Sequence, residues 1–84
     1  MSNNGLTKLV EELSELVVVA AKRIAYPNDL YHPDGSNQRE RLQDEMGDVL
    51  AIIEYVRNTQ ALNLAQIQAR QATKLRLYRQ WADE

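Results

Sequence analysis

Four carboxylic acids stand in this sequence as two matched pairs, each pair three residues apart and set among apolar residues. The first pair is Glu12 and Glu15, and the second is Glu45 and Asp48. Residues three apart on an α-helix project from one face, and acids rarely occupy a face meant for burial unless something neutralises them. A divalent cation would do so, and the two pairs therefore predict a metal site.

The ligand chemistry favours a hard cation. Carboxylate oxygens suit Mg²⁺, with Mn²⁺ as a substitute, better than zinc or copper, and the chain has one histidine and no cysteine. A plainer interpretation is that these are surface acids paired at helical spacing with Lys8, Lys22 and Arg41. Two matched pairs on facing helices favour the metal site, because four ionised carboxylates would repel one another strongly without a cation.

Helical periodicity predicts the elements that position these acids. Apolar residues recur at helical spacing over 6–25, and Pro27 disfavours helical geometry in the residue before it. A loop of about ten residues follows, over 26–36, because this segment contains a second proline and an Asp-Gly turn signal.

Two capping signatures predict the remaining helices. Asn37 and Asn63 are each followed three residues later by Glu or Gln, a pattern typical of helix N-termini. They predict helices over about 38–58 and 64–82. No strand pattern competes with these segments, so the predicted fold class is all-α.

Length and helix composition predict the architecture. With 84 residues, 44% of them hydrophobic, the chain fits a single domain over 1–84. The first two helices are long enough to form an antiparallel hairpin, and we expect the third to cover one side of it. Because the first helix is apolar over most of its circumference around 17–21, we predict that a homodimer or homotetramer completes a four-helix-type bundle.

Charge and hydropathy limit the classes of partner. The formal net charge is -2, with acids and bases interleaved, so the chain lacks the broad basic field typical of nucleic-acid binding. The longest apolar run covers only 16–21, far short of the roughly 20 residues that span a membrane. We predict a cytoplasmic protein that binds neither nucleic acid nor membrane.

Two acidic motifs contain the paired acids. One is an EExxE run, Glu11-Glu12-Leu13-Ser14-Glu15, and the other, one helix later, is an ExxD run, Glu45-Met46-Gly47-Asp48. With their hydrophobic framing in KLVEELSEL and LQDEMGDVLAIIEYV, they resemble the MazG-like all-α nucleoside triphosphate pyrophosphohydrolase superfamily. The resemblance covers about residues 6–82.

This resemblance implies a function. It implies a helical dimer or tetramer that depends on Mg²⁺ and hydrolyses a nucleoside or deoxynucleoside triphosphate to the monophosphate and pyrophosphate. The two acid pairs would hold the metal, which lowers the pKa of a bound water. Glu11 or Glu15 would orient that water or act as the general base.

Substrate binding would also need cations for the phosphates and groups for the base. Lys74, on the rim of the third apolar stripe, is the strongest phosphate-binding candidate. The full set of substrate-binding candidates is Lys74, Arg79, Lys22, Arg41, Asn28, Tyr31 and His32. A solvated basic face, an ion pair with a neighbouring acid or simple packing would explain each of them as well.

Two other functions stay open. Phosphoribosyl-ATP pyrophosphohydrolases share the paired-acid pattern and are the alternative among enzymes. A non-catalytic helical dimerisation or interaction module is the alternative from another class. A ferritin-like di-iron centre is disfavoured, because no helix carries a Glu-x-x-His motif.

Overall fold

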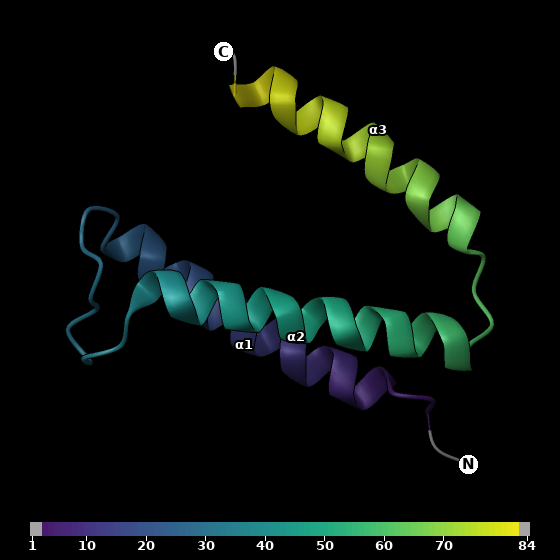
Figure 1. Cartoon of the computed structure of the whole chain (residues 1–84), viewed down its shortest axis with the longest axis horizontal. Helices are drawn as coiled ribbons and strands as arrows, with labels where there is room; N and C mark the ends of the chain where they lie inside the picture. The colour runs from purple at the N-terminus through teal and green to yellow at the C-terminus, as the bar shows by residue number, and fades with distance from the viewer. Residues whose placement is uncertain (1–2, 83–84) are drawn as a thin grey trace.

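The computed structural model describes residues 3–82 and forms three helices, α1 (Leu6–Ala25), α2 (Gln38–Thr59) and α3 (Leu64–Ala82). Helices α1 and α2 lie side by side as an antiparallel hairpin, and α3 runs back from the end of α2 at an open angle (Figure 1). The described residues form no β-strand. None of the three helices, as far as the structure describes them, combines the length and apolar content needed to cross a bilayer. The all-α prediction is confirmed, and the helix ranges agree to within one residue.

Both predicted N-terminal caps are present. The side-chain oxygen of Asn37 accepts a hydrogen bond from the backbone N–H of Glu40 at 3.0 Å. The side-chain oxygen of Asn63 does the same for the backbone N–H of Gln66, at 2.9 Å. Each cap satisfies one of the N–H groups that a helix start leaves unpaired, which explains why α2 and α3 begin where they do.

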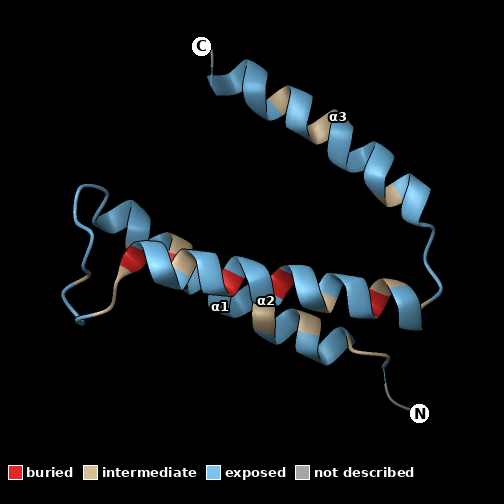
Figure 2. Ribbon diagram, viewed as in Figure 1, coloured by how far each residue is buried: buried red, intermediate tan, exposed pale blue. Residues whose placement is uncertain are grey.

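Packing is concentrated in the hairpin. The buried apolar side chains among the described residues are Val19, Val49 and Val56, and they are accompanied by two buried polar residues, Gln38 and Glu45. Figure 2 shows the buried positions on α1 and α2. A core this small leaves most apolar surface of the chain uncovered.

The prediction that the third helix covers one side of the hairpin is wrong for the single chain. Helix α3 has no buried residue, and Trp81 near its end is 59% exposed. The radius of gyration is 15.5 Å, compared with about 12 Å for a compact chain of this length. The turn over 60–63 directs α3 away from the hairpin, so no residue of its apolar stripe is buried in the single chain.

That turn has a left-handed residue that is not glycine. Ala61 has φ +52°, while the backbone N–H of Leu62 donates to the carbonyl of Arg57 at 2.9 Å and that of Ala61 to the carbonyl of Asn58 at 3.3 Å. These two bonds are the Schellman arrangement, in which glycine is the usual left-handed residue. The left-handed conformation costs a residue with a side chain about 1–2 kcal/mol.

We therefore expect Ala61→Gly to raise the free energy of unfolding by about 0.5–1 kcal/mol, because the relief exceeds the entropy that glycine adds to the unfolded chain. Urea unfolding followed by circular dichroism measures this change. The control is Ala51→Gly in the exposed middle of α2, which should lower stability by about 1 kcal/mol. A lower midpoint for Ala61→Gly would contradict the expectation.

Candidate metal centre

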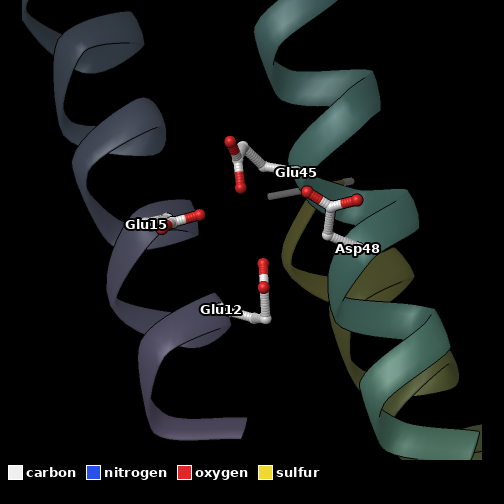
Figure 3. Close-up of side chains that lie close together, drawn as sticks. All are labelled: Glu12, Glu15, Glu45 and Asp48. Carbon is white, nitrogen blue, oxygen red and sulfur yellow. The ribbon is translucent and has the colours of Figure 1, made fainter. Parts of the chain in front are cut away.

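The two acid pairs meet between α1 and α2. Glu12 and Glu15 lie one helical turn apart on α1, and Glu45 and Asp48 lie one turn apart on α2. One carboxylate oxygen from each of the four lies within 4.8 Å of the others. Figure 3 shows all four side chains pointing into the space between the helices. The predicted convergence of the two pairs is confirmed, while the ion itself stays a prediction.

Glu45 is the buried member of this carboxylate cluster, at 4% exposure. Its Oε1 forms an ion pair with Nη2 of Arg41 at 3.2 Å. Burial raises the pKa of Glu45 above its ordinary value, the charge of Glu15 raises it further, and Arg41 opposes both. The ionised form of Glu45 is therefore disfavoured unless positive charge is added to the site.

Two carboxylate oxygens in the cluster have no partner. Oε2 of Glu45 and Oε2 of Glu12 are both buried and accept no hydrogen bond from any residue that the structure describes. A buried polar atom without a partner is costly, and most such atoms in folded proteins are satisfied. A hard cation held by the four carboxylates would satisfy both oxygens and neutralise the repulsion, so the donor set fits Mg²⁺ or Mn²⁺.

Several predicted site residues are already paired with acids. Lys8 Nζ lies 3.0 Å from Glu11, which is exposed and lies outside the carboxylate cluster. Lys22 Nζ lies 2.7 Å from Asp34, and Arg41 contacts Glu45 as described. Ion pairing therefore accounts for the positions of Lys22 and Arg41 in the single chain.

The loop residues take part in the packing of the loop itself. Nδ1 of His32 accepts from the backbone N–H of Asp34 at 3.0 Å, and the His32 ring lies edge-on to Tyr26 with ring centres 5.0 Å apart. Hydrogen bonds from Lys22 and Ser36 hold the pKa of Asp34 well below its ordinary value. The loop ends where α2 begins, and Glu45 lies on α2 about two helical turns beyond its first residue, Gln38.

The other loop and α3 candidates lie on separate surfaces. Tyr31 is exposed and forms an antiparallel bridge with Asn37, and Asn28 lines a hollow with residues of the loop, α1 and α2. Lys74 lines a hollow formed by the 62–74 segment. Arg79 lies on α3 as well, so one chain does not bring these α3 cations to the carboxylate cluster.

Sequence reasoning missed the residue that holds the loop against the hairpin. Gln38 is buried, and its side-chain amide donates to the backbone carbonyls of Tyr26, at 2.9 Å, and Asp29, at 2.6 Å. The available signal was weak, because a glutamine just after a helix cap is usually exposed. Its role depends on contacts nine and twelve residues away, which no local pattern encodes.

No protein-family profile, curated protein or solved structure matches this chain. The positions and environments of the acids are therefore the physical basis for assigning a function.

The unpartnered oxygens predict that Glu45→Gln separates stability from metal binding. Without metal, the variant should melt at the same temperature as the unaltered protein or higher, because an amide removes a buried repulsive charge. Mg²⁺ or Mn²⁺ binding, measured by calorimetry, should be lost. The control is Glu54→Gln, an exposed acid of α2 outside the cluster, which should bind the metal normally. Strong destabilisation of metal-free Glu45→Gln would contradict the prediction.

Metal should also stabilise the unaltered protein. An ion that binds only the folded state at ten times its dissociation constant adds about 1.4 kcal/mol, which corresponds to roughly 5–10 °C for a domain of this size. Differential scanning fluorimetry across a Mg²⁺ titration measures the shift. An unchanged melting temperature at millimolar Mg²⁺ would count against the site.

Proposed function

We propose that this chain is a Mg²⁺-dependent pyrophosphohydrolase of the MazG-like all-α type, which converts a nucleoside or deoxynucleoside triphosphate to the monophosphate and pyrophosphate. The observation that carries the proposal is the carboxylate cluster, in which four acids converge and two buried oxygens lack partners. The EExxE and ExxD motifs, which contain all four acids, add the reaction class by resemblance.

The chemistry follows from the donor set. Mg²⁺ held by the four carboxylates would offset phosphate charge and lower the pKa of a bound water. Water attacks the α-phosphorus, the bond from that phosphorus to the bridging oxygen breaks, and pyrophosphate leaves. Glu15, which belongs to the cluster, is better placed to take the proton than Glu11, whose carboxylate pairs with Lys8.

A second copy of the chain is part of the proposal, because one copy leaves too much surface uncovered. The single chain exposes 6585 Å², whereas a folded monomer of 9.7 kDa exposes about 5,100 Å². The surplus of about 1,500 Å² is nearly twice what one partner contributes to a standard interface. We infer a homodimer or homotetramer in which a neighbouring copy completes the helical bundle.

Assembly would also give the α3 cations a role. Helix α3 has no buried residue in one chain and carries Lys74 and Arg79. We propose that packing of α3 against a neighbouring hairpin covers its apolar residues and places Lys74, and beside it Arg79, to bind substrate phosphates. Lysine and arginine are the side chains suited to that charge.

Two alternatives would account for the same motifs. Phosphoribosyl-ATP pyrophosphohydrolase activity needs the same paired acids and differs in substrate. A non-catalytic dimerisation module would keep the helices but have no use for the acids. The unpartnered buried oxygens favour a metal-binding role over this module, since an inert interface has no reason to bury unpaired carboxylates.

A nucleotide panel with Mg²⁺ tests the activity. The panel contains the common ribo- and deoxyribonucleoside triphosphates and phosphoribosyl-ATP, and the products are separated by chromatography after reaction in ¹⁸O-labelled water. We expect the label in the monophosphate, because attack occurs at the α-phosphorus. Glu12→Gln and Asp48→Asn should each lower kcat/KM by about a hundredfold or more, with Glu54→Gln as the matched control. If the protein hydrolyses none of these nucleotides, the proposed enzymatic activity is refuted.

Charged substitutions at exposed apolar residues of the hairpin test the proposed assembly. Val17 and Leu50 are 67% and 68% exposed, so a charge at either position leaves the packing within one chain intact. We expect sedimentation equilibrium to give an oligomer for the unaltered protein and a monomer for Val17→Glu or Leu50→Glu. Gln43→Glu, at an exposed polar position of α2, should remain oligomeric. A monomeric unaltered protein would disprove the assembly.

A further inference from the structure

An open groove adjoins the carboxylate cluster on the side of the α1 N-terminus. It has a volume of about 440 Å³ and is lined by Lys8 and Glu12 of α1 and by Asp48, Ala51, Ile52 and Tyr55 of α2. Two members of the cluster therefore form part of its wall. The volume lies within the range of about 300–1,000 Å³ typical of small-molecule sites.

The hollow found on the loop side of the cluster is much smaller. Lys22 and Arg41 line a hollow of about 10 Å³ towards the loop, which holds no more than a water molecule. The loop side is closed by Gln38, whose amide bonds the carbonyls of Tyr26 and Asp29. Within the hairpin, the groove beside Lys8 and Tyr55 therefore has room for a ligand larger than an ion next to the four carboxylates.

The ring of Tyr55 is held in place by the chain that precedes α1. A Cβ at Gly5 would lie 2.8 Å from Cδ2 of Tyr55 and 2.9 Å from its Cε2, and Gly5 has φ +89°. The close approach and the left-handed conformation both require glycine there. Bonds from Thr59 Oγ1 to the Asn4 carbonyl, at 2.8 Å, and from the Gln60 amide to the Asn3 carbonyl fasten this segment to α2.

Lys8 supplies a cation at the same groove. Its ammonium pairs with Glu11 at 3.0 Å and remains exposed. The pKa of Lys8 is raised, first by the hydrogen bond and charge of Glu11 and then by Glu12 and Glu15. Lys8 is therefore positively charged at neutral pH, beside the acids that would hold the metal.

We propose that this groove binds the nucleotide itself, with the phosphates between the carboxylate cluster and Lys8 and with the base on Tyr55 and Ile52. The inference rests on the proposed function and adds which surface the substrate occupies. The charged end of the groove suits the phosphates, and the apolar floor with its exposed ring suits the base. Aromatic rings stack on any base. This assigns substrate binding to Lys8 and Tyr55, in place of the loop residues Asn28, Tyr31 and His32.

The test measures nucleotide and metal binding separately. The α,β-methylene analogues of ATP, GTP, CTP and UTP are titrated with Mg²⁺ into the unaltered protein and its variants, and KM is measured with the hydrolysable nucleotides. Tyr55→Ala should raise the analogue Kd and KM at least about fivefold, and Tyr55→Phe by less than about twofold, because the ring supplies the contact. Lys8→Ala should raise both about tenfold through loss of a charge-assisted bond.

Controls make the outcomes distinct. Metal binding should be unchanged in all of these variants, and Tyr31→Ala, which removes an exposed ring of the loop, should bind nucleotide normally. If Tyr55→Ala fails to fold, Lys8→Ala decides, because its side chain is exposed. If the unaltered protein turns over nucleotide and both Lys8→Ala and Tyr55→Ala keep its Kd and KM, the proposal that the groove binds nucleotide is overturned, and the proposed function is not. Absence of both turnover and analogue binding in the unaltered protein would overturn the groove and the proposed function together.

Discussion

A carboxylate buried between two helices is the constraint on which this structure depends. Glu45 occupies the interior of the α1–α2 interface, where a hydrophobic residue would ordinarily pack. Among the described residues, Arg41 is the cation that contacts it, at one of its two oxygens, while the neighbouring acids oppose its ionisation. A site of this kind is destabilising for the hairpin alone and would become favourable with a bound cation, so in the proposed function the same residues link ion binding to folding.

The carboxylate cluster also limits the hydrophobic core. Three valines are the buried apolar residues of the described chain, and on α2 Glu45 takes the buried position one turn before Val49. A domain of this length buries only a small hydrophobic core. In the proposed assembly, association with another copy would supply the apolar burial that the hairpin interior lacks, through the surface that one chain leaves uncovered on α1, α2 and α3.

Local patterns predicted most of the fold and the four acids. Helix periodicity, Pro27 and the Asn37 and Asn63 caps act within a few residues, and the i, i+3 spacing of each acid pair is itself local. The position of α3 was not predictable, because it depends on the left-handed Ala61, which carries no glycine signal. The role of Gln38 in closing the loop was missed for a similar reason, as it depends on carbonyls brought near only by the folded hairpin.

The two ends of the hairpin differ in how much open space they leave next to the carboxylate cluster. At the loop end, the Gln38 amide bonds the loop carbonyl of Tyr26, and the hollow lined by Lys22, Gln38 and Arg41 has a volume of only about 10 Å³. At the other end, Gly5 lets the chain cross close beneath Tyr55 and leaves the groove open along Ala51 and Ile52. A side chain at Gly5 would displace the ring, so the smallest residue of the entry segment controls the shape of the surface next to the acids. Under the proposed function, this difference in packing would determine from which side a ligand reaches the four carboxylates.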